Sequence, residues 1–211
     1  MARRGGELRE HILRTAKDVF LEMGFERASM DVMAARAATS KRSLYAHFES
    51  KDKLFLAVVD LVRELYLGKL KTPDAYGEDT AKAVVVFCGR FLQLLLWEPA
   101  LRTCRLGITE AGRLPEASAQ YYDAIFDTTH ERLAAFLSER CQLAPSTSTE
   151  ITHDLLGRTV YPRLFRALLG VEKPLNGQPD EASIAADIDL APIRTAVAAL
   201  LPSEGAGTPR P

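Results

Sequence analysis

Cations, hydroxyl groups and an imidazole alternate along one short stretch of the chain. These polar side chains are Lys41, Arg42, Ser43, Tyr45 and His47. Leu44 and Phe48 stand among them, four residues apart, and at helical spacing they form one buried stripe while the polar side chains face other directions. Ammonium, guanidinium and hydroxyl groups on an exposed helix can bond phosphates and base edges. The pattern therefore predicts a short helix that presents a surface to a nucleic-acid groove.

A second short helix must hold that surface in place. The apolar residues that repeat at one-turn spacing just before it are Met33, Ala34 and Ala37. They predict a helix over Asp31 to Ala37, with the hydroxyl of Ser29 as its N-cap and Asp31 in its first turn. A connection of three residues follows, and Ser40 is in position to cap the next helix. Two short helices joined by so tight a connection form a helix-turn-helix.

The run A-A-R-A-A-T-S-K-R-S-L-Y-A-H-F-E-S-K-D-K-L-F resembles the DNA-binding segment of TetR-type transcription regulators. The usual pattern there is small-x-x-A-G-V-S-x-x-x-L-Y-x-H/Y-F-x-S-K-x-x-L. The resemblance is strong over about the first 60 residues and concerns only the architecture beyond them. Ala38 replaces the usual glycine at a turn position that tends to need a positive φ, which predicts some backbone strain or a slightly different turn. Thr39 replaces the usual valine, and neither change removes a DNA-facing group.

The resemblance implies an all-α fold with three N-terminal helices for DNA and a larger helical body for ligand binding and dimerisation. We expect a DNA-binding domain over residues 1–50, a body over 51–201 whose segment 51–70 is a connecting helix, and a disordered tail over 202–211. The expected protein is a homodimeric, ligand-responsive repressor that binds double-stranded operator DNA and is released from it by a small hydrophobic molecule. The expected DNA contacts are Ser29, Met30, Ser40, Lys41, Arg42, Ser43, Tyr45, His47 and Lys51.

The distribution of charge agrees with localised contact to phosphates. The 211 residues carry a net charge of −1, but residues 1–53 hold 11 Lys and Arg against 8 Asp and Glu, so the remainder is acidic. The three cysteines, Cys88, Cys104 and Cys141, have neither the number nor the spacing of a disulfide framework or a zinc site. The N-terminus lacks a signal peptide pattern, and no apolar run is long enough to span a bilayer. We expect a cytoplasmic protein without cofactor, metal or membrane partner.

Apolar periodicity predicts further helices and no strands. The first helix starts near Leu8 and ends at Gly24, and Ser50 caps a helix that continues to about Leu70. The later helices are expected over Thr80–Trp97, which is apolar nearly all round, Ala100–Gly112, Glu116–Leu143, Glu150–Gly170 with a kink near Tyr161, and Asp187–Leu201. Prolines and glycines predict loops over Thr72–Asp79 and Val171–Asp180.

The helical body provides candidates for two further surfaces. A pocket for a small hydrophobic or aromatic molecule is expected among Phe87, Arg90, Phe91, Cys104, Ile108, Tyr122, Phe126 and Phe165. A dimer interface is expected from the last two large helices, through Ile151, Leu155, Val160, Leu164, Leu168, Ile188, Ile193, Val197 and Leu200. The alternative for each of these residues is plain packing in the core of one chain.

Catalysis is not expected, because the sequence holds none of the usual catalytic motifs. Glu110, Asp123 and His130 are candidates for a catalytic group if the fold brings them together, but on amphipathic helices such residues are usually solvated or structural. Two non-enzymatic alternatives remain open beside a DNA-binding regulator. One is a ligand carrier that has lost operator binding, and the other is a thiol sensor that acts through Cys88 or Cys104.

Overall fold

A computed structural model describes residues 5–177, 179 and 183–201 of the chain, and the predicted tail over 202–211 lies outside them. The described part is all-α as predicted, apart from one isolated bridge between Trp97 and Leu175. The helices, in chain order, are α1 (Gly5–Arg27), α2 (Met30–Arg36), α3 (Lys41–His47), α4 (Lys51–Leu67), the short 3-10 helix η1 (Pro73–Tyr76), α5 (Thr80–Leu96), α6 (Glu98–Glu110), α7 (Pro115–Tyr122), the π-helical turn η2 (Asp123–Asp127), α8 (Thr128–Cys141), α9 (Pro145–Thr159), α10 (Tyr161–Leu168) and α11 (Ala191–Leu200).

These elements form two compact units. The first contains residues 5–66 and Arg102–Ile125, which include α1 to α4, most of α6, and α7. The second contains Leu67–Leu101 and the described residues from Phe126 onward, which include α5, α8, α9, α10 and α11. The helix predicted as a connector, α4, therefore packs within the first unit.

Three phenylalanines form the centre of the first unit. The ring of Phe55 on α4 meets Phe20 and Phe25 edge-on, with centroids 5.1 and 5.2 Å away, and the latter two rings stack at 5.5 Å. Gly24 has a φ of 73°, which ends the regular part of α1 where the sequence predicts a C-cap glycine, and the chain turns there before Arg27. Burial of these aromatic rings fixes α1 against α4.

Serine caps define the two short helices of the predicted helix-turn-helix. The N–H of Val32 donates to Ser29 Oγ at 3.2 Å, and the N–H of Ser43 donates to Ser40 Oγ at 3.0 Å. Both caps have the extended backbone that precedes a helix, as predicted from the sequence. Ala38, in the connection between the helices, has a φ of 49°. The expected positive φ at this position is therefore confirmed, and an alanine adopts it.

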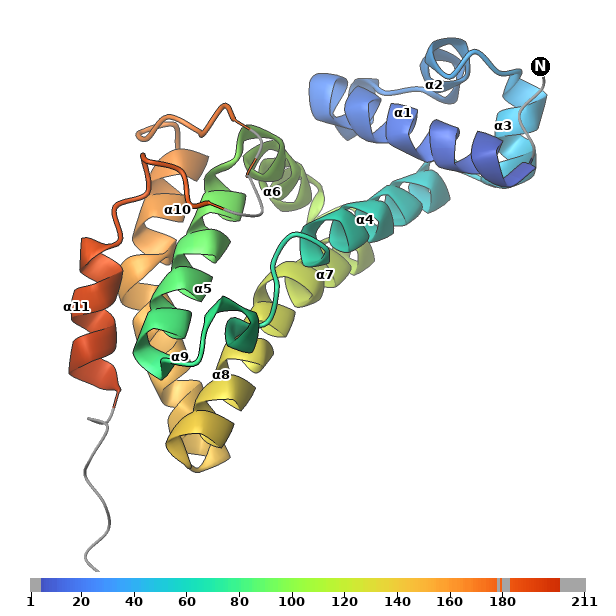
Figure 1. Ribbon diagram of the computed structural model, residues 1–211. Coiled ribbons are helices and arrows are strands. Elements are labelled where there is room, and N and C mark those ends of the chain that lie inside the picture. Colours follow the sequence, from blue (N-terminus) through green and yellow to red (C-terminus); the bar gives the residue numbers. More distant parts are fainter. Residues whose placement is uncertain (1–4, 178, 180–182, 202–211) are drawn as a thin grey trace, which may run out of the picture. The chain divides into compact units, whose positions relative to one another are not determined.

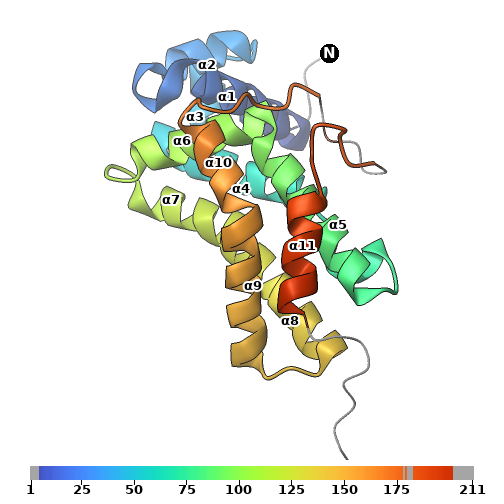
Figure 2. The same ribbon diagram turned by 90° about the vertical axis from the view of Figure 1, so that its left-hand side faces the viewer.

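In the second unit α5 lies at the centre, because its residues are buried on nearly every side. Helices α9 and α11 run beside each other, and α11 also packs against α5 (Figures 1 and 2). Helices α9 and α10 follow one another end to end, with the break at Val160 that Pro162 predicts. No helix in the described residues is long and apolar enough to cross a membrane.

Several predicted helix boundaries are wrong, each for a local reason. The expected long helix over Glu116–Leu143 is interrupted by the π-helical turn η2. The expected start at Glu150 lies five residues too late, because Pro145 occupies the first position of α9. The Ser/Thr run over 146–149, which lies between two of the expected helices, is helical, and the hydroxyls of Ser148 and Thr149 donate to the carbonyl of Pro145 at 2.9 Å. Similarly, α11 begins at Ala191 instead of Asp187, with a proline in its first turn.

Candidate nucleic-acid interface

The fold gives α3 one buried residue and a polar outer surface. Leu44 is fully buried, and Phe48 at the C-cap is nearly so, whereas Lys41, Arg42 and Tyr45 are exposed. Tyr45 keeps 43% of its surface accessible, which is unusual for so large a side chain. Because Leu44 anchors the helix from below, the cations and the phenol are held outward at fixed one-turn spacing.

The two cations at the start of α3 differ in their surroundings. Lys41 Nζ lies 2.8 Å from Asp31 Oδ1 on α2, and this hydrogen bond, followed by the carboxylate charge, raises the pKa of the ammonium. Arg42 makes neither a hydrogen bond nor an ion pair with any residue that the structure describes. The guanidinium of Arg42 is therefore available to an external acceptor, while Lys41 would have to exchange Asp31 for a phosphate.

The remaining predicted contacts fall into two groups. Ser43, Tyr45 and His47 lie on α3 with exposed or half-buried side chains, and Ser29 and Ser40 are exposed while serving as N-caps. Met30 was predicted as a DNA contact, but its side chain is buried and can offer only its backbone. Apolar packing decides this position, because Met30 begins α2 on the side that faces the core.

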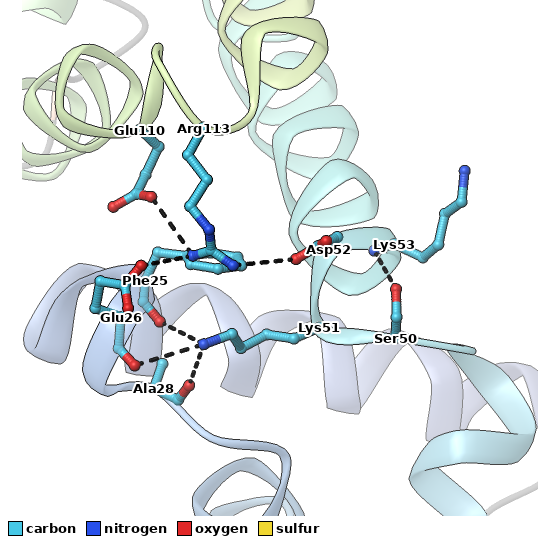
Figure 3. Close-up of polar contacts among 9 residues, drawn as sticks. All are labelled: Phe25, Glu26, Ala28, Ser50, Lys51, Asp52, Lys53, Glu110 and Arg113. Atoms are coloured by element: carbon cyan, nitrogen blue, oxygen red, sulfur yellow. Dashed lines mark hydrogen bonds and ion pairs between the residues drawn. The ribbon is translucent and has the colours of Figure 1, made fainter.

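Lys51 was also predicted to bond the DNA backbone, and the structure assigns its ammonium to another role. Its Nζ donates to the carbonyls of Phe25 at 2.9 Å, Ala28 at 3.0 Å and Glu26 at 3.5 Å (Figure 3). It also lies 4.2 Å from the centroid of the Phe25 ring. An ammonium has three donors, and here all three meet carbonyls at the end of α1, where the helix dipole favours a cation.

Arg113, from the connection between α6 and α7, approaches the same ring. Its guanidinium carbon lies 4.2 Å from the Phe25 centroid, and its terminal nitrogens lie 2.8 Å from Glu26 Oε1 and 3.7 Å from Asp52 Oδ1 (Figure 3). Glu110 at the end of α6 lies 3.9 Å from it. Arg113 thus joins the end of α1 to the start of α4. Sequence reasoning missed it, because a lone arginine in a loop carries no periodicity that reveals its partners.

The predicted ligand-binding residues do not form one pocket. Phe87, Phe91 and Phe126 are buried in the second unit together with Arg90, and the rings of Phe91 and Phe126 lie 6.4 Å apart. Cys104 is buried in the first unit. The expectation that Ile108, Tyr122 and Phe165 point inward is wrong, because more than half of each side chain is exposed. Helical spacing predicts which residues share a face, but it does not say which face is covered.

The predicted dimer residues mostly close the core of a single chain. The six that are buried are Leu155, Val160, Leu164, Ile188, Ile193 and Val197. Ile151, Leu168 and Leu200 are partly exposed. The apolar side chains that remain accessible near α10 are instead Phe165 at 60%, Leu169 at 80% and Val171 at 62%. This accessible apolar cluster includes none of the residues that were predicted for the interface.

The thiols and the candidate catalytic groups have structural surroundings. Burial raises the pKa of Cys88 to about 12 and that of Cys104 to about 11, so little reactive thiolate forms near neutral pH. The carboxylate of Glu110 is buried and faces Arg113, while His130 shares a hydrogen bond with Tyr161 in the other unit. The structure therefore gives no support to a thiol sensor through these two cysteines.

Comparisons with known proteins agree with this architecture. The family described as bacterial regulatory proteins, tetR family, matches residues 12–58, which cover α2, α3 and parts of α1 and α4. The family described as AefR-like transcriptional repressor, C-terminal domain, matches residues 82–143. Together the two matched segments make up slightly more than half of the chain.

Curated relatives match the N-terminal part. The HTH-type transcriptional activator FasR of Mycolicibacterium smegmatis is 47% identical over 53 residues, which are 25% of this chain and 24% of FasR. The HTH-type transcriptional regulator UidR of Escherichia coli K12 is 37% identical over 65 residues, which are 31% of this chain and 33% of UidR. The chain thus spans only a quarter to a third of the length of these relatives.

Solved structures match over nearly the whole length. The flavonoid-responsive regulator FrrA superposes with a TM-score of 0.68 at 25% identity, covering 92% of this chain and 93% of FrrA. A TetR-family regulator from Mesorhizobium loti superposes with a TM-score of 0.73 at 20% identity, covering 94% of this chain and 97% of that one. With a helix-turn-helix and a helical body that each match a segment of the same kind of regulator, the chain belongs to the TetR family of bacterial regulatory proteins.

Proposed function

We propose that this protein is a dimeric, ligand-responsive transcription regulator that reads operator DNA with α3. The observation that carries the proposal is the outer surface of α3, where Arg42 is unengaged within the described structure and Tyr45 is exposed beside the ion-paired Lys41. In this arrangement Arg42 reads a base edge and Tyr45 bonds a phosphate. Further contacts to the DNA backbone would come from nearby polar residues that are exposed or half-buried, namely Ser29, Ser40, Ser43 and His47.

The test of this assignment is operator binding by two variants that differ in the expected outcome. Arg42→Ala removes a base contact, so it should cost about 1–3 kcal/mol and relax sequence preference at one position. Tyr45→Phe removes a phosphate contact, so binding should weaken evenly for all sequences. Arg63→Ala, an exposed arginine on α4 with one loose ion pair to Asp60, is the matched control. Wild-type affinity in both α3 variants, with folding intact, would refute the assignment. The DNA upstream of the protein's own gene is the first operator to try.

We propose repression as the direction of control. The body matches a domain described for an AefR-like transcriptional repressor, and this match supports the proposal. Activation is the second candidate, favoured by the name of FasR, a transcriptional activator that is 47% identical to this chain over 53 residues. A reporter gene behind the bound operator separates the two, because deletion of a repressor raises expression while deletion of an activator lowers it.

The ligand that we propose is a small hydrophobic or aromatic molecule bound by the second unit. Supporting it are the buried rings of Phe87, Phe91 and Phe126, and the side-chain oxygen of Gln93, which is buried without a hydrogen-bond partner. FrrA, which has a similar fold, is named flavonoid-responsive. Aromatic walls with a few polar groups are usual in such sites. A carrier without operator binding is the rival function, and the operator measurements above decide between them.

A further inference from the structure

A groove of about 190 Å³ lies between α8 and α9 in the second unit, apart from the aromatic residues assigned to the ligand above. The residues that line it are Asp127, His130, Glu131, Ala134, Thr149, Thr152 and His153. The groove is smaller than a typical pocket for a drug-sized molecule. Any ligand here must therefore be small.

Two carboxylates give the groove its charge. Asp127 and Glu131 are four residues apart, at the end of η2 and in the first turn of α8, so they share one side of the helix. Neither forms an ion pair or a hydrogen bond with another described residue. On α9, by contrast, Asp154 is paired with Arg158 at 2.8 Å. The groove thus carries two negative charges that the described part of the chain leaves uncompensated.

Two imidazole rings, of His130 and His153, line the groove beside the two carboxylates. The rings of His130 and His153 lie 5.1 Å apart, and His130 Nε2 shares a hydrogen bond with the hydroxyl of Tyr161 on α10. Burial, and then the neighbouring His153, lower the pKa of His130, against the opposing effect of Asp127. His130 is therefore neutral near pH 7, and a neutral imidazole offers one nitrogen as an acceptor.

A buried hydroxyl in the lining points independently to a missing partner. Thr152 is fully buried, and its Oγ1 has no hydrogen-bond partner, whereas the nearby Thr149 donates to the carbonyl of Pro145. Buried polar atoms are nearly always bonded, and one left unsatisfied costs free energy. Thr152 Oγ1 is therefore an acceptor in the lining that no described residue uses.

We propose that this groove binds a small organic cation, a protonated primary amine or an amidinium. Carboxylates, neutral imidazole nitrogen and a hydroxyl oxygen are all acceptors, and an ammonium has three donors and the opposite charge. An anion would meet two like charges. A metal ion is disfavoured because the described residues include no group of three or more His, Cys, Asp or Glu placed to hold one. The cation would lie between α8 and α9, with its charge on Asp127 and Glu131.

The experiment titrates the full-length protein with butylamine and, as the uncharged control of equal chain length, butanol. The readout is the side-chain NMR signals of His130 and His153, which lie in the groove. Butylamine should shift both signals saturably at millimolar concentration, and butanol should not. The double variant Asp127→Asn, Glu131→Gln should weaken binding at least about tenfold. Glu139→Gln, which removes an exposed carboxylate of the same helix outside the groove, should leave it unchanged.

Acidification provides a second readout with a fixed sign. Protonation of His130 adds a positive charge to the groove, so butylamine should bind less tightly at about pH 5 than at about pH 8. The charged or titratable groups that face His130 are Asp127, His153 and Tyr161. No saturable shift, or an equal shift in the double variant, would overturn the proposal. So would a response to Ni²⁺ with none to butylamine. Operator binding is measured separately, so either result leaves the proposed regulator function intact.

Discussion

Lys51 and Lys41 are both lysines at the start of a helix near the reading surface, yet their chemistry differs. Lys41 is exposed and holds one carboxylate, which a phosphate can replace. Lys51 is half-buried, and its ammonium donates to three backbone carbonyls at the end of α1. Removal of those donors would leave the carbonyls of Phe25 and Ala28 without these partners. The number of acceptors that the protein places around each ammonium therefore distinguishes the two residues. Lys41 can exchange its partner for an external group, whereas Lys51 stabilises the fold.

Ala38 allows a test of backbone strain at a single residue. The left-handed region destabilises the folded state by about 1–2 kcal/mol for an L-residue, and glycine avoids this strain. Glycine also raises the conformational entropy of the unfolded chain, which lowers the stability of the folded state by about 0.4–1 kcal/mol. Because Ala38 has a φ of 49° and an exposed side chain, Ala38→Gly should raise the free energy of unfolding by up to about 1 kcal/mol.

The matched control for this substitution is Ala46→Gly in the exposed part of α3, where glycine should lower stability by about 1 kcal/mol. Urea denaturation of both variants gives the two values. The same sign of change at both positions would contradict the strain at Ala38.

Among the helices, the serine N-caps could be predicted from the sequence. The first residues of α9 and α11, which have a proline in the first turn, could not. Ser29, Ser40 and Ser50 each cap a helix through the N–H three residues later, and this geometry depends only on local sequence. Pro145 can begin a helix or end one, and the Ser/Thr run after it favours either state. Packing of Thr152 and Leu155 into the core decides for the helix. Local rules cannot supply that long-range information.

The candidate site follows the same division. The residues of α3 were predictable because one short motif fixes both their order and their exposure. The contacts of Arg113 with Phe25, Glu26 and Asp52 join parts of the chain that are 61 or more residues apart, so no local pattern encodes them. Sequence reasoning therefore recovers the exposed polar surface of α3 and misses the contacts of Arg113 that join α1 to α4.

Arg113 carries a prediction about how the end of α1 is held against the start of α4. Its contacts are partly exposed, so the ion pairs contribute about 0.2–1 kcal/mol and the ring contact about 0.5–1 kcal/mol. Arg113→Met keeps the apolar stem but removes these terms, and should lower the free energy of unfolding by about 1–2 kcal/mol at low salt. The deficit should shrink in about 1 M salt, where the ion pairs are screened and the ring contact remains.

Arg63→Met, an exposed arginine with a loose pair to Asp60 at 3.9 Å, serves as the control for loss of a surface cation. Chemical denaturation at the two salt concentrations measures both variants. If Arg113→Met were no more destabilising than Arg63→Met, the contacts of Arg113 would contribute nothing beyond those of an ordinary surface pair.

At the scale of the whole molecule, the remaining question is where two chains would meet. One helix-turn-helix makes few contacts, and specific regulators place two of them about 34–36 Å apart on DNA. Most apolar residues predicted for the interface are used within one chain, because α10 and α11 pack against α5, and α9 packs against α8 and α11. The exposed apolar side chains at α10, Phe165 and Leu169, stand four residues apart on one side of that helix, and Val171 follows them. Such a cluster on the surface is typical of a protein interface.

We therefore predict that α10 contributes the centre of a twofold interface and that Phe165→Asp with Leu169→Asp converts the dimer into a monomer. Two charges would be buried without partners in such an interface, and each unpaired buried charge is strongly unfavourable. Light scattering should give the mass of a dimer for the wild type and about half of it for the double variant.

Ile108→Asp, which places the same charge on an exposed apolar position in the first unit, controls for charge alone and should stay dimeric. Because each monomer would present a single α3, operator affinity should fall in parallel with dimerisation. A double variant that remains a dimer with unchanged operator affinity would place the interface elsewhere, and a wild type that is a monomer would remove the twofold assembly from the proposed function.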